Sequence, residues 1–245
     1  MNILTIDTST EIELIALSVD GKIYQYSNYT KMSHSITMFD NLSSLLSEAS
    51  IKIDEIDLIG TGIGPGSFTG IRIAVSTARM FAQILRIPLV GIKSQEIYAA
   101  SVQGFDNHTI LAAFDAKKSK VFAGVYSLKG SDPHEIIEPG DYYMDEILES
   151  TINHNDIRYI KEVEGAVNLV CIGDGCKKYM DVIDNLSKEN GFFYTNIINF
   201  IPNGKAATEL TISKYNESPK KYINFENTLP FYARKSDAEI SKSSK

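Results

Sequence analysis

Residues 2–26 read NILTIDTSTEIELIALSVDGKIYQY and contain three short segments with strand character. The first, Asn2–Asp7, is an apolar run that ends in an acid, and Glu13–Val19 and Lys22–Tyr26 follow it. The dipeptide Asp20-Gly21 joins the last two segments. It suits a two-residue hairpin turn, because glycine adopts a positive φ without steric cost. The stretch therefore predicts a meander of three antiparallel strands.

Helices and strands alternate after this meander. Apolar residues at helical spacing predict a helix that buries one face, with Met38, Leu42 and Leu45 on it. We then expect a strand at Asp57–Gly62, a long helix at Thr69–Arg86, a strand at Ile87–Ile92 and a shorter helix at Gln95–Val102. The order of this first half is β-β-β-α-β-α-β-α.

The same order recurs after the turn-prone stretch Gly104-Phe105-Asp106-Asn107. Strands are predicted at Thr109–Asp115, Lys120–Leu128, His134–Ile137, Asn168–Ile172 and Tyr194–Phe200, and helices at Asp145–Thr151, Lys177–Lys188 and Lys205–Tyr215. Asp7 and Asp115 end the first strand of each half. We therefore predict an α/β fold made of two ribonuclease-H-like units, the duplicated architecture of actin, Hsp70 and the sugar kinases (ASKHA).

This order implies three regions. An N-terminal ribonuclease-H-like domain, with the glycine-rich loop and the interface helices described below, is expected over residues 1–105. A reduced C-terminal domain of the same kind is expected over residues 106–235, and a solvated tail over residues 236–245.

The composition is that of an ordinary globular protein. Of 245 residues, 43% are hydrophobic, which provides enough apolar surface to offset the entropy of folding. Lys and Arg number 24 and Asp and Glu 31, and the formal charge of −7 argues against direct binding of nucleic acid or anionic membranes. We find neither a membrane-length apolar run nor a secretory leader. We expect a cytoplasmic protein in which Cys171 and Cys176 are core residues.

Residues 60–70 read GTGIGPGSFTG and lie between a predicted strand and a predicted helix, where backbone amides can bind a phosphate. The Walker motif requires Gly-Lys-Ser/Thr, but no lysine occurs between Ile56 and Lys93. The Gly-x-Gly-x-x-Gly dinucleotide motif fails in every register. A structural role is favoured over anion binding for the loop, whose residues of interest are Gly64, Pro65, Gly66, Ser67, Phe68, Thr69, Gly70 and Arg72.

The turn Asp7-Thr8-Ser9-Thr10 is the second candidate site. In actin-like phosphotransferases this turn carries an acid for Mg²⁺ and a glycine that lets amides approach the phosphates. Ser9 stands where that glycine would be, so Asp7 could ligate a metal or cap the turn. The second half offers only Asp115-Ala116-Lys117-Lys118 and Gly173-Asp174-Gly175, which leaves a nucleotide site incomplete.

Other catalytic patterns are weaker still. The four histidines are scattered, with no His-x3-His pair for a metal: His34, His108, His134 and His154. We interpret His34 as a residue at the start of a helix. Cys171 and Cys176 have the wrong spacing for a redox Cys-x-x-Cys motif. The sequence therefore contains no catalytic constellation that we can identify.

The long helix at Thr69–Arg86 is apolar around most of its circumference. One face carries Ile71, Ala74, Val75, Ala78, Phe81, Ala82 and Leu85, and a second apolar line is formed by Ile73, Thr77, Met80 and Ile84. A helix of this kind is buried on both sides. The second line is covered either by another part of the same chain or by a second subunit, and we favour the subunit interface.

Residues 64–73, GPGSFTGIRI, resemble the hallmark segment of the TsaB (YeaZ) family. These proteins are subunits of the bacterial system that makes threonylcarbamoyladenosine in tRNA. Four further segments are similar to the family pattern, with departures at Ile36, Lys117 and Ala233: Ile6–Thr10, Ser33-His34-Ser35, Asp115-Ala116-Lys117 and Pro230–Arg234.

The resemblance implies an actin-like fold and a non-catalytic partner of the paralogue TsaD, with no cofactor or metal of its own. TsaD would hold the metal and transfer the threonylcarbamoyl group to the adenosine next to the anticodon. The interface would comprise Ile73, Thr77, Met80 and Ile84, with Met38, Leu42 and Leu45 on the neighbouring helix. TsaE, an ATPase, would engage the TsaB–TsaD pair, the chain alone would form a homodimer, and tRNA would be contacted only through the complex.

Two alternatives remain open at this point. The chain could be an ATP-dependent phosphotransferase or a metallopeptidase-like enzyme of the actin-like superfamily, as Asp7 and the glycine-rich turn would allow. It could also be a module that binds tRNA directly, which the charge of −7 disfavours.

Overall fold

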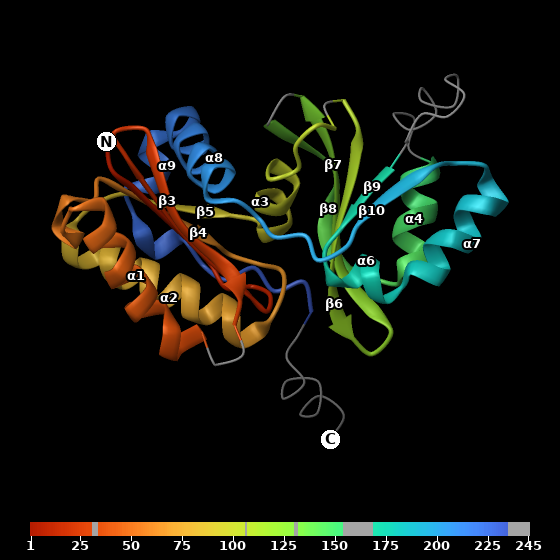
Figure 1. The fold of residues 1–245 in the computed structure, drawn as a ribbon, viewed down its shortest axis with the longest axis horizontal. Helices are drawn as coiled ribbons and strands as arrows, with labels where there is room; N and C mark the ends of the chain where they lie inside the picture. The colour runs from red at the N-terminus through yellow and green to blue at the C-terminus, as the bar shows by residue number, and fades with distance from the viewer. Residues whose placement is uncertain (31–33, 106, 130–131, 154–168, 235–245) are drawn as a thin grey trace.

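The computed structural model describes residues 1–30, 34–105, 107–129, 132–153 and 169–234. Two five-stranded sheets stand side by side, with helices between them and on their outer faces (Figure 1). The predicted tail at 236–245, together with Ser33 and His154, lies outside the described residues.

The first sheet has the order β3-β2-β1-β4-β5. Its strands are β1 (Ile3–Asp7), β2 (Ile12–Val19), β3 (Lys22–Tyr29), β4 (Leu58–Gly62) and β5 (Leu89–Ile92). The first three pair antiparallel, whereas β4 pairs parallel to both β1 and β5. Asp20 and Gly21 have φ values of 50° and 80°, which match the predicted two-residue hairpin.

The second sheet repeats this plan, in the order β10-β9-β6-β7-β8. Its strands are β6 (Thr109–Lys117), β7 (Lys120–Lys129), β8 (Asp132–Tyr142), β9 (Leu169–Ile172) and β10 (Tyr194–Ile197). Strands β6 to β8 again form an antiparallel meander, and β9 pairs parallel to β6 and β10. The predicted duplication of a ribonuclease-H-like unit is confirmed.

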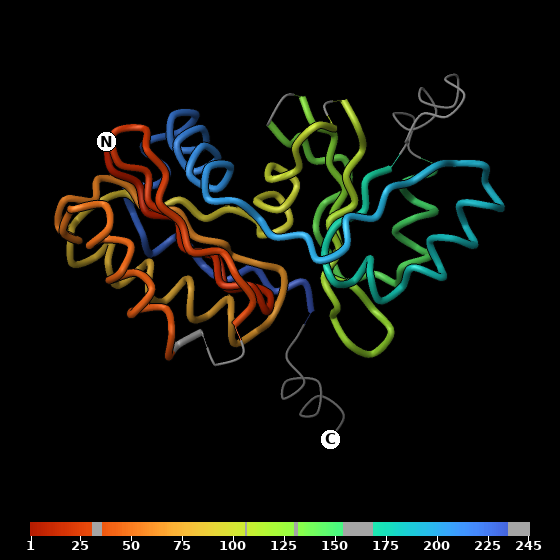
Figure 2. Tube along the Cα trace, in the orientation of Figure 1, coloured from red at the N-terminus to blue at the C-terminus, as the bar shows by residue number. Residues whose placement is uncertain are grey.

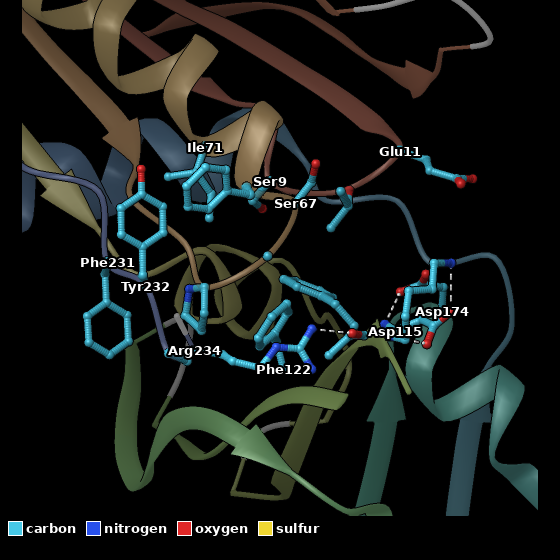
Figure 3. Close-up of a pocket in the computed structure, with 18 of the residues that line it drawn as sticks. Ser9, Glu11, Ser67, Ile71, Asp115, Phe122, Asp174, Phe231, Tyr232 and Arg234 are labelled. Atoms are coloured by element: carbon cyan, nitrogen blue, oxygen red, sulfur yellow. Dashed lines mark hydrogen bonds and ion pairs between the residues drawn. The ribbon is translucent and has the colours of Figure 1, made fainter. Parts of the chain in front are cut away.

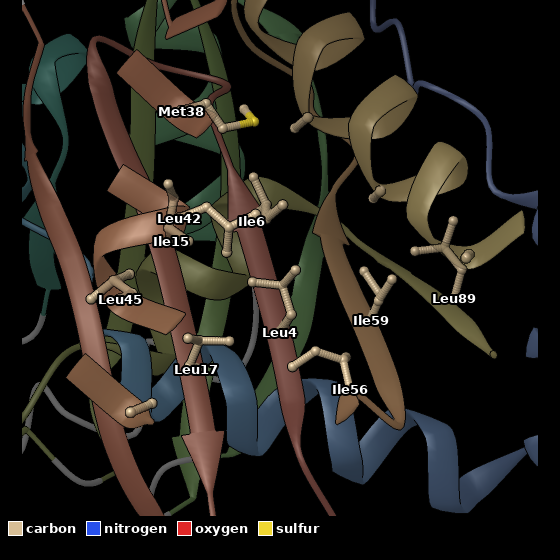
Figure 4. Packing of buried hydrophobic residues seen from close by; sticks show 14 residues of the cluster. Leu4, Ile6, Ile15, Leu17, Met38, Leu42, Leu45, Ile56, Ile59 and Leu89 are labelled. Carbon is tan, nitrogen blue, oxygen red and sulfur yellow. The ribbon is translucent and has the colours of Figure 1, made fainter. Parts of the chain in front are cut away.

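Helices α1 (His34–Ala49) and α2 (Phe68–Leu85) cover the outer face of the first sheet. Figure 4 shows α1 side chains packed against Leu4 and Leu17 of the sheet. The exposed fractions of Met38, Leu42 and Leu45 are 0%, 3% and 6%. This burial corrects the expectation that these three residues contact a partner, because their side chains face their own sheet.

The last helix of each predicted half packs on the sheet of the other half. Helix α3 (Ser94–Ala100) lies against β6, β7 and β8, and α8 (Gly204–Glu217) lies against the first sheet. The hydroxyls of Thr5 in β1 and Thr211 in α8 are hydrogen-bonded at 2.8 Å. The predicted boundary at residues 105 and 106 separates the strands of the two sheets, whereas the chain crosses back for these two helices (Figure 2).

Helices α4 (Met144–Asn153) and α7 (Met180–Asn190) cover the outer face of the second sheet. The single helix predicted at Lys177–Lys188 is two helices, because Tyr179 leaves helical geometry at φ −107° and ψ 29° between α6 (Asp174–Lys178) and α7. Both cysteines are fully buried in this layer, as predicted. Among the described residues, no helix combines the length and apolar character of a membrane span.

Three short helices complete the described part of the chain. A 3-10 helix, η1 (Ile53–Glu55), precedes β4, and α9 (Pro219–Tyr222) follows α8. A second 3-10 helix, η3 (Phe225–Asn227), lies against α2. The chain then returns to the middle of the molecule through Leu229–Arg234, between the two sheets (Figure 1).

Candidate functional site

A cavity of about 630 Å³ lies between the two halves (Figure 3). The β1–β2 turn and the glycine-rich loop form one wall, and the ends of β6 and β7 with the start of α6 form the other. The segment Phe231–Arg234 closes one side. The two sequence candidates, the Asp7 turn and the glycine-rich loop, are therefore brought together at the same cleft as Asp115.

The glycines of the loop allow it to lie directly on the β1–β2 turn. A Cβ atom on Gly62 would overlap the Asp7 carboxylate, one on Gly66 would overlap the Ser9 carbonyl oxygen, and one on Gly70 would overlap the Thr8 carbonyl oxygen. Only residues without a side chain permit two backbones to approach so closely. This geometry supports the structural interpretation of the loop.

Three of the loop amides donate hydrogen bonds within the chain. Ser67 N–H donates to the Ser9 carbonyl at 2.7 Å, and Gly64 N–H donates to Ser94 Oγ at 3.1 Å. The side chain of Ser67 caps α2 by accepting the Gly70 N–H. These donors, which a phosphate-binding loop would point at an anion, are committed to the fold instead.

Asp7 caps its own turn. Its Oδ1 accepts the Ser9 N–H at 2.6 Å, and only 2% of the residue is exposed. The actin-like fold implies a magnesium nucleotide at this place, which requires a free turn amide and an accessible acid. Neither is provided here, since Ser9 N–H and Asp7 are both used by the turn. The residues present do not fit that group.

The equivalent turn of the second half is built on ion pairs. Asp115 accepts from Lys117 Nζ at 2.8 Å and from Lys178 Nζ at 2.9 and 3.0 Å. Burial alone would raise the pKa of Asp115, but the hydrogen bonds from Lys117 and Lys178 outweigh it and hold the pKa below its usual value. Asp174 accepts the Asp115 N–H at 3.1 Å, and burial raises the pKa of Asp174.

The C-terminal segment ties the two walls together. Phe231 N–H donates to the Ile63 carbonyl at 2.7 Å, and the Tyr232 ring stacks on Phe68 with centroids 4.7 Å apart. Arg234 donates to the Ala116 carbonyl at 2.7 Å and lies over the Phe122 ring (Figure 3).

Arg72 holds the same segment from α2. Its guanidinium carbon is 3.9 Å from the centre of the Phe68 ring, and its Nε donates to Tyr232 Oη at 2.8 Å. The arginine of the decapeptide thus fastens the C-terminal segment to the loop. The resemblance identified Arg72 and the C-terminal segment separately but not their contact.

The outward face of α1 and α2 carries a second candidate site. Four apolar side chains are exposed there, which we call the α1–α2 patch: Ile36 (56%), Phe39 (48%), Met80 (39%) and Ile84 (68%). Phe39 contacts Phe81 edge to face, with ring centroids 6.4 Å apart, so the two helices meet in the patch. Ile36 and Phe39 were not identified as interface residues from the sequence. The signal was present, because neither residue lies on the face of the predicted helix that carries Met38, Leu42 and Leu45.

The predicted apolar line on α2 is only partly exposed. Thr77 is 8% exposed and Ile73 is half-buried, and both are covered by the chain itself. Phe225 of η3 packs against the same apolar cluster as Ile73. Met80 and Ile84 are therefore the members of the line that reach solvent.

The described histidines do not gather into a metal site. Within the described ranges, no group of three or more His, Cys, Asp or Glu side chains could hold a metal ion. His34 is the first residue of α1, as predicted for a helix start, and His108 and His134 lie in the second half.

A model of the family described as TsaD, tRNA N6-adenosine threonylcarbamoyltransferase, matches residues 28–242. The chain belongs to this family. Within it, the chain falls among the TsaB (YeaZ) proteins, and the resemblance found in the decapeptide is confirmed.

Two curated relatives illustrate the match. The chain is 33% identical to the tRNA threonylcarbamoyladenosine biosynthesis protein TsaB of Bacillus subtilis over 61% of its length and 65% of that protein. It is 25% identical to the protein of the same name from Escherichia coli, over 96% of this chain and 95% of the relative. The Bacillus match thus spans just under two thirds of that relative.

A solved structure supports the fold. YeaZ from Pseudomonas aeruginosa superimposes with a TM-score of 0.70 at 21% identity, covering 94% of this chain and 99% of that one. The likeness agrees with the duplicated actin-like α/β architecture described above.

Proposed function

We propose that the chain is a non-catalytic subunit that binds and activates TsaD in the modification of tRNA. TsaD would transfer the threonylcarbamoyl group to the adenosine next to the anticodon. Membership of the TsaD family and the names of the TsaB relatives support the pathway. The engaged Asp7 and loop amides support a subunit role, because the residues that a phosphotransferase would present to its nucleotide are used here by the fold.

The observation that carries the proposal is the α1–α2 patch. Ile84 and Phe39 expose 68% and 48% of their surface, although both belong to helices whose other faces are buried in a core. Contiguous exposed apolar side chains of this kind mark sites where another protein binds. The buried Met38, Leu42 and Leu45 support the patch from beneath and are not part of it.

The remaining partners follow from the same role. TsaD occupies the patch in the active complex, and a second copy of the chain occupies it when TsaD is absent. TsaE engages the TsaB–TsaD pair. The net charge of −7 supports tRNA contact through the complex rather than by this chain alone. The complex would act in the cytoplasm.

Partner binding is tested with the variant Met80→Asp/Ile84→Asp in the full chain. Desolvating two carboxylates in an apolar interface costs several kcal/mol, so we expect TsaD affinity to fall at least about a hundredfold, at about 1.4 kcal/mol per factor of ten. The chain alone should elute as a monomer in size-exclusion chromatography with light scattering.

A control variant carries one new carboxylate elsewhere on the surface. Ile198 is 52% exposed and lies beyond β10 on the second half, so Ile198→Asp should bind TsaD like the unmodified chain. If the doubly charged variant folds and binds TsaD normally, the α1–α2 patch is not the interface.

The alternative of an ATP-dependent phosphotransferase or a metallopeptidase-like enzyme has a direct test. Calorimetry of the chain with ATP and Mg²⁺ should give no micromolar binding, because Asp7 and Ser9 N–H are engaged with each other. Micromolar binding that Asp7→Ala abolishes would favour the enzyme instead.

A further inference from the structure

The cavity between the sheets has the size and lining of a small-molecule site. Its volume of about 630 Å³ falls within the range of about 300–1,000 Å³ typical of ligand pockets. Phe68 of α2 and Tyr232 of the C-terminal segment line it, as do Phe114 and Phe122 of the second sheet. Aromatic walls on both sides favour a flat ligand that can stack between them.

A buried hydroxyl without a partner lies at this cavity. Ser9 is 1% exposed and lines the wall, and its Oγ has no hydrogen-bond partner in the described part of the chain (Figure 3). A buried hydroxyl left in this state costs free energy unless something else satisfies it. Its position calls for a ligand atom that donates or accepts one hydrogen bond.

The opposite end of the cavity is acidic. Asp174 and Glu11 line it, and Asp174 Oδ1 accepts the Asp115 N–H. Carboxylates in such positions accept hydrogen bonds from hydroxyl groups, as acids do from the ribose of bound nucleotides. A ligand with an aromatic ring at one end and hydroxyl groups at the other matches this arrangement.

Phosphate groups are disfavoured in the same cavity. The turn amide of Ser9 and the loop amides of Gly64, Ser67 and Gly70 are used by the fold. The cations of the cavity are committed as well, Lys117 to Asp115, and Arg234 to the Ala116 carbonyl and to Asp141 at 3.7 Å. A phosphate near Glu11 and Asp174 would meet like charge.

We propose that this cavity binds a phosphate-free nucleoside, with its base between the aromatic walls and its ribose hydroxyls at Asp174 and Glu11. The site is separate from the α1–α2 patch, so the proposal does not depend on TsaD binding. It also differs from a nucleotide site of the actin-like kind, because the ligand is recognised by its ring and hydroxyls and is weakened by each added phosphate.

The test is calorimetry of the full chain with four nucleosides and with AMP and ATP·Mg²⁺. We expect at least one nucleoside to bind, and its 5′-phosphates to bind at least tenfold more weakly. Phe122→Ala should reduce nucleoside affinity at least tenfold by removing one wall, and Asp174→Asn at least threefold. Phe193→Ala, at an aromatic side chain that is 58% exposed outside the cavity, should have no effect.

The outcomes separate cleanly. The proposal is overturned if no nucleoside binds at millimolar concentration, if ATP·Mg²⁺ binds more tightly than every nucleoside, or if the cavity variants bind like the control. Asp174 is at the exposed mouth of the cavity, so Asp174→Asn decides the question even if Phe122→Ala fails to fold. TsaD capture by the same variants should be unchanged, which distinguishes this result from a failure of the proposed function.

Discussion

The β1–β2 turn and the β6–β7 turn occupy equivalent positions in the two halves, and each follows a strand with an acid at or near its end: Asp7 is the last residue of β1, and Asp115 lies two residues before the end of β6. In the first, Asp7 is buried and caps its own turn through the Ser9 N–H. In the second, Asp115 pairs with Lys117 and Lys178 at the edge of the cavity. The same fold position therefore serves packing in one half and an ionic cavity wall in the other.

The neighbours of the two turns explain this difference. The first turn lies under the glycine-rich loop, where backbone meets backbone at Gly66 and Gly70. The second turn lies beside the start of α6, where Gly173 has φ +96° and brings Asp174 against β6. Both halves use glycine to bring a loop onto the first strand, but only in the second does the strand acid itself, Asp115, line the cavity. The two halves therefore share the glycine contact at the first strand but differ in the interactions of the strand acid.

The largest effect is expected from Gly70→Ala in the first half. A Cβ atom there would overlap the Thr8 carbonyl oxygen, so we expect a loss of about 3 kcal/mol or more in unfolding free energy. Alanine is otherwise the better helix residue by about 1 kcal/mol, so any loss comes from the clash. Urea denaturation provides the measurement.

Gly104→Ala is the matched control for this substitution. Gly104 has φ +78°, but nothing lies within 4 Å of its Cβ position, so only backbone strain of about 1 kcal/mol is expected. Equal losses at the two glycines would show that the loop does not rest on the turn as described.

An intermediate effect is expected from removing the two acids. Asp7→Ala leaves the buried Ser9 N–H without its acceptor, which should cost about 2–3 kcal/mol. Asp115→Ala removes ion pairs to Lys117 and Lys178, whose side chains are 76% and 46% exposed, and should cost about 1 kcal/mol or less. Thermal and urea denaturation of both variants measure the difference, and the reverse order would contradict the contrast drawn between the two turns.

The order of strands and helices along the chain was predictable because it rests on local signals. Short stretches of sequence predict the hairpin at Asp20-Gly21 and the alternation of strands and helices. The structure contains both. The edge strand β8 is longer than predicted, at Asp132–Tyr142 instead of His134–Ile137. Pro133 and Pro139 weaken the strand pattern in the sequence, because proline cannot donate to a sheet ladder. Both are tolerated in β8 because an edge strand has a side without ladder hydrogen bonds.

The placement of α3 and α8 was not predictable in this way. Each helix was recognised, but nothing in its own residues states which sheet it covers, because both sheets offer similar apolar faces. The candidate site shows the same limit. Asp7, Asp115 and the loop were identified locally, whereas Phe122 joins the Asp7 turn and the loop only when the two halves meet.

The smallest expected effect is the pH dependence of stability at the second turn, where Asp115 and Asp174 have opposite pKa shifts. The pKa of Asp115 is lowered in the folded state, so its stabilising contribution is present above the unfolded carboxyl pKa of about 3.9 and is lost as the pH falls through the lower folded value. The pKa of Asp174 is raised, so its ionised form disfavours the fold at neutral pH, and this penalty fades as the pH falls toward about 4.

The two amide variants should therefore have opposite signs. Asp115→Asn should lower the urea midpoint by a similar amount from pH 8 to about pH 4.5, because the pKa of Asp115 lies below that window. Asp174→Asn should raise the midpoint slightly at pH 7 and lose that gain toward pH 4, because the asparagine avoids burying a charge. Urea midpoints measured across this pH range for both variants and the unmodified chain test the pair. If both variants shift the urea midpoint in the same direction at pH 7, the two acids do not differ as described. Asp115 would then not act as an ionised partner of the lysines while Asp174 acts as a carboxyl with a raised pKa.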